Sequence, residues 1–324
     1  MRVLVVTSEF PTAARPQAVP FIYQEVLYLC KAGIDLEVFH FRGNRNPLNY
    51  LRSWLKLRQS YDLSQYDLIH AHFGQSGLLV LSTRTPLVVT FHGSDLQGIV
   101  GPHGKYTMAG QVLRHLSKLV AKRAKGIIVS SEHLKKFLSP GLPIKVISPG
   151  IDLESFRPMP RSQARRQLGL PLDKRLVLFA AHPGDPVKRY PLAQQAVALA
   201  ADRFTVELVA LGGVQHQSVP LYMNACDVLL ITSQHEGSPT VLKEALACNL
   251  PIVSVDVGDV QSRIGHVPGC AVCDDDAPDT VAAGLVKVLM ENRRIPGREQ
   301  VISLDVRLVV QKILEVYRSA LAAG

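Results

Sequence analysis

Short apolar runs alternate along the chain with longer segments whose apolar residues recur at helical spacing. In the first half the runs are apolar on both faces and predict strands at 2–7, 35–41, 68–70, 87–91, 126–130 and 144–147. Helical spacing between these runs predicts helices near 18–31, 107–123 and 131–138. This alternation indicates βαβ units, and therefore an α/β fold with a doubly wound parallel sheet.

The second half repeats the alternation. It predicts strands at 175–180, 204–211, 228–231, 251–254 and 270–272, and helices at 161–168, 190–201, 240–248 and 278–290. Proline and glycine cluster at 148–160 and indicate a linker. We therefore expect two Rossmann-like domains, 1–155 and 156–305, facing each other across a cleft. We also expect an amphipathic C-terminal helix within 306–324 that packs back on the first domain.

Composition narrows the class of protein. The 324 residues are 47% hydrophobic and 19% charged, which excludes a disordered or fibrous chain. No apolar run reaches the ~18 residues of a membrane helix, and the N-terminus lacks the pattern of a signal peptide. We interpret the chain as soluble and cytoplasmic. The lone pair Cys270 and Cys273 lacks the partners of a zinc site and is interpreted as packing.

Positive charge is concentrated in the first half. Residues 1–155 contain 18 Lys/Arg and 10 Asp/Glu, whereas 156–324 contain 18 and 17. The stretches 42–58 and 105–125 contain no acid, and the first carries Trp54 among leucines. A basic amphipathic segment is typical either of an ordinary solvated helix face or of one that lies on an anionic membrane; we favour the membrane. The candidate basic residues are Arg52, Lys56, Arg114, Lys118 and Lys122.

Ligands of open parallel sheets bind beyond the carboxyl ends of the strands. Polar or glycine-containing segments follow the predicted strands at 7–9, 70–74, 91–95, 130–132, 182–185, 212–213 and 233–238. We interpret His70 and His72 as packing or acceptor-side residues that cannot easily face one metal. The acidic run 274–276 precedes a predicted helix, where acids are favourable, so we predict no metal.

The segment Glu236–Glu244 carries the most specific chemistry. A loop with Glu236 and Gly237 follows a predicted strand, and a helix begins near Pro239 or Thr240. The free N–H groups of a helix N-terminus suit a diphosphate. The side chain of Glu244 leans back toward that terminus, where its carboxylate could accept hydrogen bonds from both hydroxyls of a ribose. A capped helix with both glutamates solvated remains the alternative.

This segment resembles the Glu-x7-Glu motif of the retaining family 4 glycosyltransferases, which have the GT-B fold of two Rossmann-like domains. The resemblance extends over most of the chain and is nearest to bacterial enzymes of surface-polysaccharide assembly. Its other ordered segments are Thr90–Asp95, Ile147–Asp152, Pro186–Arg189, Val219–Asp227 and Pro251–Ser254.

The resemblance implies a role for each matching residue. Glu244 would bind the donor ribose, Glu236 would face the donor sugar, and Lys188 would neutralise the leaving diphosphate. His92 would lie near the donor sugar from the first domain. Backbone N–H groups would bind sugar and phosphates, and the loop near Val219 would border the base. The remaining donor-binding candidates are His182, Arg189, Gly237, Ser238, Pro239, Thr240 and Val241.

Two departures from the family pattern concern the diphosphate. The family arginine six residues before the lysine is replaced by His182. A histidine has an unperturbed pKa near neutrality, so it would act there as a pH switch; alternatively it shapes the loop, with Arg189 supplying the second charge. The glycine-rich turn after the first strand is also missing, because 12–21 contains no glycine.

The sequence therefore predicts a metal-independent retaining glycosyltransferase. Its donor would be a nucleoside-diphosphate sugar and its acceptor a lipid-linked or polysaccharide hydroxyl, with the enzyme peripheral on the inner face of the cell membrane. A sugar-phosphate synthase or an epimerase of the same fold is the first alternative. A basic nucleic-acid-binding protein is the second, although no binding motif supports it. The absence of Gly-x-Gly-x-x-Gly after a strand disfavours an oxidoreductase.

Overall fold

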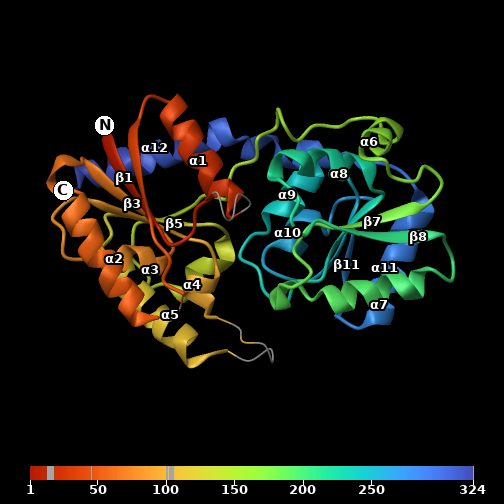
Figure 1. The fold of residues 1–324 in the computed structure, drawn as a ribbon, viewed down its shortest axis with the longest axis horizontal. Helices are drawn as coiled ribbons and strands as arrows, with labels where there is room; N and C mark the ends of the chain where they lie inside the picture. The colour runs from red at the N-terminus through yellow and green to blue at the C-terminus, as the bar shows by residue number, and fades with distance from the viewer. Residues whose placement is uncertain (13–17, 45, 100, 102–105, 324) are drawn as a thin grey trace. The chain divides into compact units, whose positions relative to one another are not determined.

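The chain forms two compact units in the structure, a computed structural model that describes residues 1–12, 18–44, 46–99, 101 and 106–323. The first unit consists of Met1–Gly150 with Val306–Gly324, and the second unit is Ile151–Asp305 (Figure 1). The chain enters the second unit within the predicted linker and returns to the first unit for its last helix.

The first unit is built on a parallel sheet. Its six strands follow the order β2-β1-β3-β4-β5-β6. They are β1 (Arg2–Thr7), β2 (Asp35–His40), β3 (Leu68–His72), β4 (Leu87–Phe91), β5 (Gly126–Val129) and β6 (Ile144–Val146). Strands β3, β4 and β5 are buried along their whole length, as their apolar runs predict.

Helices connect these strands. They are α1 (Pro20–Lys31), α2 (Pro47–Ser60), α3 (Gly74–Leu78), α4 (Ser94–Gln97) and α5 (Met108–Arg123), with short 3₁₀ turns at Leu63–Gln65 and Glu132–Phe137. The start of α2 is fixed locally: Asn46 accepts a hydrogen bond from Leu48 N at 3.0 Å, and Pro47 occupies the first turn. Gly74 lets α3 approach α5, because a Cβ there would lie 2.0 Å from Ser117 Oγ.

The C-terminal helix α12 (Val306–Ala322) belongs to the first unit. Figure 1 shows it in blue among the red and orange elements. Its buried row, which includes Val309, Ile313 and Tyr317, packs with Val88 and Ile128 on one face of the sheet. The apolar residues that recur at helical spacing in the sequence therefore form the face of α12 that covers β4 and β5.

The second unit is also a parallel sheet, of five strands in the order β11-β10-β9-β7-β8. The strands are β7 (Arg175–Phe179), β8 (Val206–Ala210), β9 (Val228–Ile231), β10 (Ile252–Val255) and β11 (Ala271–Cys273). The helices are α6 (Arg161–Leu168), α7 (Tyr190–Ala200), α8 (Val219–Ala225), α9 (Thr240–Ala247), α10 (Val260–Ile264) and α11 (Pro278–Glu291). Three 3₁₀ turns lie at Pro186–Lys188, His216–Ser218 and Gly297–Leu304.

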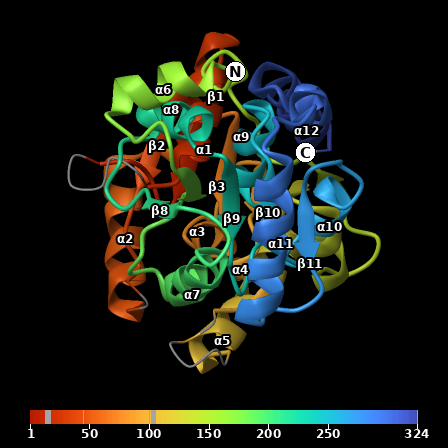
Figure 2. The ribbon, with the colours of Figure 1, turned by 90° about the vertical axis from the view of Figure 1, so that its right-hand side faces the viewer.

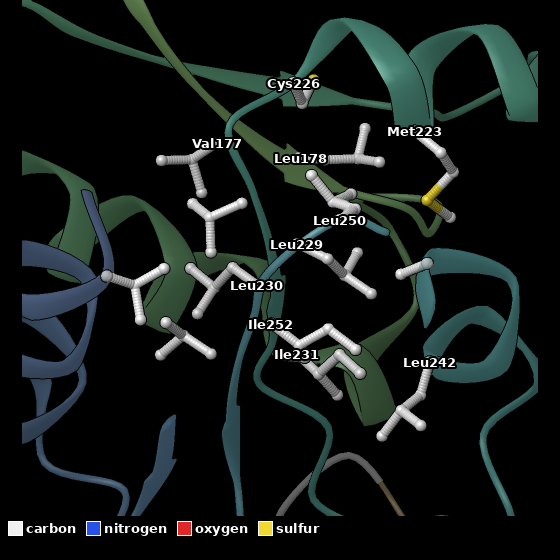
Figure 3. Packing of buried hydrophobic residues seen from close by; sticks show 14 of the residues in the cluster. Val177, Leu178, Met223, Cys226, Leu229, Leu230, Ile231, Leu242, Leu250 and Ile252 are labelled. Atoms are coloured by element: carbon white, nitrogen blue, oxygen red, sulfur yellow. The ribbon is translucent and has the colours of Figure 1, made fainter. Parts of the chain in front are cut away.

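Helices cover both faces of this sheet. Figure 2 shows α11 lying along β10 and β11. On the other face, Leu229 and Ile231 of β9 meet Met223 of α8 and Leu242 of α9 in an apolar core (Figure 3). The prediction of two doubly wound parallel-sheet domains is confirmed, and every predicted strand forms with ends that differ by at most two residues.

Each sheet has one place where the strand order reverses direction. In the first unit this switch lies between β1 and β3, and in the second between β7 and β9. The loops after two such strands diverge to opposite faces of the sheet, which opens a crevice at their carboxyl ends. The loops after β1, β3, β7 and β9 are therefore the first places to look for a site.

Candidate active site

The loop after β7 is fastened to the end of β9 at the switch of the second unit. Thr232 Oγ1 donates to the carbonyl of Lys188 at 2.7 Å, and Gln234 N donates to the carbonyl of Val187 at 2.9 Å. Arg189 has left-handed backbone (φ 52°), and its Nε donates to the carbonyl of Thr232 at 2.6 Å. These contacts bring two segments that are distant in sequence to one sheet edge.

Lys188 and Glu236 meet at this edge. Lys188 Nζ lies 2.5 Å from Glu236 Oε1, and the two side chains are 29% and 15% exposed. A pair that is open to solvent on one side contributes little to stability. It instead holds the ammonium of Lys188 against the loop that leads into α9.

The N-terminus of α9 adds hydrogen-bond donors. Its first position is preceded by Pro239, which supplies no side-chain cap, and the first turn contains no acid. The leading N–H groups are therefore available to an anionic ligand. Gly237, Ser238 and Pro239 are buried, whereas Thr240 and Val241 are partly exposed.

Neighbouring loops hold the Glu236–Ser238 segment. Ser238 Oγ donates to Asp259 Oδ2 at 2.7 Å, and the same oxygen accepts from Arg263 Nε at 2.5 Å. Gly258 has φ +63°, and a Cβ there would lie 2.9 Å from the carbonyl oxygen of Gly237. Burial, with the nearby charge of Arg263, lowers the pKa of Lys243 to about 7. Of the residues that hold this segment, Gly258, Asp259 and Arg263 are not among the candidates predicted from the sequence.

Glu244 is buried, and its carboxylate pairs with a histidine that the sequence analysis missed. His216 Nε2 donates to Glu244 Oε1 at 2.9 Å. Burial lowers the pKa of His216, but the hydrogen bond to Glu244 and the charges of Glu244 and Asp152 outweigh it, so the pKa is raised. The ring of Phe156 lies 5.5 Å from that of His216. Val219 begins α8 just after this turn and is nearly buried.

The two basic candidates next to Lys188 have other contacts. His182 is exposed, and its Nδ1 accepts a hydrogen bond from Gly184 N at 3.0 Å, which agrees with the loop-shaping alternative. The guanidinium of Arg189 forms an ion pair with Asp276 besides its bond to Thr232. In the acidic run, Asp275 accepts hydrogen bonds from Thr280 and Ala277 N that lower its pKa, as expected of an acid before a helix.

His92 lies at the matching edge of the first unit. Its backbone N–H, with those of Gly93 and Gly74, donates to the buried carboxylate of Asp95 at 2.9–3.4 Å. Burial raises the pKa of Asp95 to about 6, against the lowering effect of these hydrogen bonds. The rings of Phe73 and Phe21 lie 4.7 and 5.1 Å from the imidazole of His92.

The interpretation that His70 and His72 cannot face one metal is wrong. Residues two positions apart on a strand lie on the same face, and the two rings are 4.3 Å apart. Ligand atoms of both histidines and of Glu25 fall within 4.8 Å of one another, and all three residues are buried. His70 already bonds Tyr317 Oη and Thr90 Oγ1, each at 2.7 Å, which supports the packing role expected for that residue.

The basic candidates of the first unit lie on α2 and α5. Arg52 and Lys56 are exposed on α2, beside Leu48, Leu51 and Leu55, which are 44–60% exposed. On α5, Lys122 is exposed, Lys118 is partly exposed, and the guanidinium of Arg114 lies 5.9 Å from the ring of Phe137. Residues 45 and 105 of the two acid-free stretches, and 13–17 of the glycine-free turn, lie outside the described residues.

Two parallel-sheet units with polar side chains beyond the carboxyl ends of their strands have the architecture of the doubly wound α/β proteins, which bind ligands at that edge. Residues 1–155 match the model of Glycosyltransferase Family 4, and residues 173–291 match that of the Glycosyl transferases group 1. Together the two matches cover most of the chain. The protein belongs to the family 4 and group 1 glycosyltransferases, and it is an enzyme of that kind.

Relatives agree with this assignment. The chain is 27% identical over 333 residues to the teichuronic acid biosynthesis glycosyltransferase TuaC of Bacillus subtilis, covering 82% of this chain and 83% of the relative. A sucrose-phosphate synthase from Thermosynechococcus elongatus has a TM-score of 0.81 at 18% identity, covering 100% and 99% of the two chains. Anabaena Alr3699/HepE in complex with UDP and glucose has a TM-score of 0.73 at 19% identity, covering 98% and 100%. These neighbours confirm the GT-B fold.

Proposed function

We propose that the protein is a retaining glycosyltransferase that moves a sugar from a nucleoside diphosphate to a lipid-linked or polysaccharide acceptor, without a metal. The observation that carries the proposal is the Lys188–Glu236 pair at the switch of the second unit, in the loop that leads into α9, where Glu244 is buried about one turn into the helix. The similarity to TuaC, which is named for teichuronic acid biosynthesis, supports a surface-polysaccharide acceptor.

The residues of the second unit fit the charge changes of such a transfer. The bond between the anomeric carbon and the phosphate oxygen breaks, and its electron pair stays on that oxygen. Lys188 and the N–H groups that begin α9 stabilise this charge. The acceptor oxygen bonds to the anomeric carbon from the same face, and the departing phosphate oxygen takes its proton. Glu236 lies beside the sugar, and His92 of the first unit contributes its imidazole.

Binding and product analysis test the proposal. We expect UDP, GDP or ADP sugars to raise the melting temperature by mass action, equally well with and without EDTA. UDP-glucose is the first donor to test, because the solved neighbour HepE carries UDP and glucose. NMR of the product should show the anomeric configuration of the donor. An inverted product excludes the retaining reaction, and binding lost in EDTA excludes metal independence.

Replacing Glu244 by alanine should weaken nucleoside diphosphate binding by about 10- to 150-fold, the equivalent of ~1.5–3 kcal/mol for a hydrogen bond to a charged acceptor. His216→Ala should have a smaller effect, because it removes the partner of the carboxylate and leaves the carboxylate in place. Titration calorimetry with UDP, GDP and ADP measures both variants. Unchanged affinity in Glu244→Ala would remove the ribose assignment.

We further propose that the enzyme lies on the inner face of the cell membrane through α2 and α5. Among the described residues, no helix is long and apolar enough to cross a bilayer. The exposed leucines of α2, flanked by Arg52 and Lys56, match an interfacial helix that places apolar side chains among acyl chains and cations among phosphates. Met108, Val112 and Leu119 form a similar exposed row on α5.

Reversing three charges on α5, with Arg114, Lys118 and Lys122 changed to Glu, should lower binding to anionic vesicles by about 10²-fold, since each basic residue near the surface contributes ~1 kcal/mol. Sedimentation with phosphatidylglycerol vesicles at physiological salt measures the effect. The matched control changes the exposed Arg166, Arg203 and Lys287 of the second unit to Glu, for the same change in net charge. Equal losses in the two variants, or no binding by the wild type, would exclude α5 as a membrane surface.

A further inference from the structure

Three buried or partly buried side chains form a line that ends at His92. Glu25 comes from α1, His72 from the end of β3, and His92 from the loop after β4. Glu25 Oε1 lies 3.3 Å from His72 Nε2, and His72 Nδ1 lies 3.1 Å from His92 Nε2. The rings of His72 and His92 are nearly parallel, with an interplanar angle of 14°. The roles proposed above use only the last of the three residues.

Burial restricts where the protons of this line can be. His72 is fully buried and Glu25 is 9% exposed. Neither Glu25 Oε1 nor His72 Nε2 makes a hydrogen bond in the described part of the chain, and each lies 3.3 Å from the other. A lone pair on His72 Nε2 would face a buried carboxylate oxygen with no proton between them, which is strongly unfavourable. The proton of His72 therefore belongs on Nε2, the nitrogen that lies on the side of Glu25.

This assignment determines the next link. A neutral His72 with its proton on Nε2 presents the Nδ1 lone pair, which can only accept a hydrogen bond. The nitrogen of His92 at 3.1 Å must then donate, so His92 carries its proton on Nε2 and its lone pair on Nδ1. The distance of 3.3 Å to Glu25 is slightly beyond an ordinary hydrogen bond, and such contacts often shorten when substrate binds.

The surroundings keep these side chains in place and add no competing proton. The neighbouring ring of His70 bonds Tyr317 and Thr90 through its two nitrogens. Burial lowers the pKa of His70 well below its usual value, so this ring is neutral. His70 Nδ1 lies 3.7 Å from Glu25 Oε1, but as a neutral ring bonded at both nitrogens it adds no charge to the line.

We propose that Glu25 and His72 are positioning residues that hold His92 in the Nε2–H tautomer, so that its Nδ1 acts as an acceptor. That His92 takes part in the transfer rests on the proposed function. An Nδ1 acceptor would receive a hydrogen bond from a sugar or acceptor hydroxyl, whereas the opposite tautomer would present a donor there. Glu25 would thus orient the imidazoles as the carboxylate of a catalytic triad orients its histidine.

Histidine NMR on the whole free protein tests the tautomer without any substrate. With ¹⁵N-labelled histidine, and with the His92 signals assigned by comparison with a His92→Asn variant, Nε2 should show the shift of a protonated nitrogen and Nδ1 that of an unprotonated one. His72→Leu should mix the two forms. His72→Asn should restore the wild-type pattern, because its Oδ1 can accept near the position of Nδ1. His70→Asn, equally buried on the same strand face, is the control and should leave the His92 tautomer unchanged.

Kinetics with a nucleotide sugar give the second readout. We expect His72→Leu to lower kcat by about 10²-fold, the scale of acid–base positioning, with KM for the donor changed less than threefold, and His72→Asn to recover most of kcat. An Nδ1–H tautomer in the wild type, or equal behaviour of the Leu and Asn variants, would overturn the proposal. So would a stoichiometric metal in the purified protein that Glu25→Gln removes, since a metal would then occupy the space between Glu25 and His72. Failure to use any nucleotide sugar would overturn the proposed function and leave the NMR result standing.

Discussion

Lys188→Ala should reduce sugar transfer by roughly 10²–10³-fold, the usual cost of removing one preorganised group that stabilises developing charge. The reason is geometric. The loop that carries Lys188 is fastened to the end of β9 through Thr232 and Gln234, so the ammonium is already in place before substrate binds. The loss should appear in kcat, because the leaving oxygen acquires most of its charge only in the transition state.

The chain offers a matched control for this variant. Lys174 Nζ pairs with Glu207 Oε2 at 3.1 Å in the same unit, at side-chain exposures of 41% and 43%. Lys174→Ala removes an equivalent ion pair away from the loops after β7 and β9, and turnover should stay near the wild-type value. Steady-state assays with the donor found by thermal shift measure both variants. Near-normal turnover in Lys188→Ala would show that the leaving diphosphate is stabilised elsewhere.

The sequence was sufficient to predict the layers of both sheets. Strands such as β3 and β9 are buried on both faces, so their apolar runs stand out from the polar loops that flank them. The order of the strands was not predictable in the same way. Lys188 and Glu236 meet because β7 and β9 are neighbours while β8 lies outside them. The strand-end rule placed both residues on one edge, and only the three-dimensional pairing shows that they touch.

The site residues that could not be predicted from the sequence share one property, which is that their roles depend on contacts with residues far away in the chain. His216 lies in a short turn with no periodic pattern, and its importance comes from a carboxylate 28 positions away. Glu25 lies on a helix that the periodicity predicts, but the role proposed for it depends on its contact with His72 of β3. Helix α2 was recognised as an amphipathic basic stretch without being assigned as a helix, because its apolar residues face outward and do not mark a buried stripe. A local sequence pattern predicts well which residues are buried. It predicts poorly which residues far apart in the sequence will be in contact.

Asp227 illustrates the difference between a matching motif and its physical role. It closes the segment Val219–Asp227 that resembles the family pattern, and its carboxylate contacts residues of α6 and β7. Asp227 is 8% exposed, and its Oδ2 accepts from Arg165 Nη2 at 2.7 Å and from Leu176 N at 2.6 Å. Its other oxygen pairs with Arg161. Arg165 is itself buried and donates to four backbone carbonyls, so this carboxylate neutralises the charge that ties α6 to the sheet.

Asp227→Ala should therefore destabilise the second unit by about 3–5 kcal/mol, because it leaves the buried guanidinium of Arg165 without its counter-charge. Asp227→Asn should cost less, since the amide oxygen can still accept a hydrogen bond from Leu176 N or from Arg165. The exposed Asp202→Ala, in the same unit, should change the stability by less than ~0.5 kcal/mol. Urea unfolding followed by circular dichroism measures all three, with the transition of each unit fitted separately because a two-unit chain need not unfold in one step. If Asp227→Ala unfolds at the same urea concentration as Asp202→Ala, the carboxylate is not what neutralises Arg165, and the backbone carbonyls alone must hold that charge in the core.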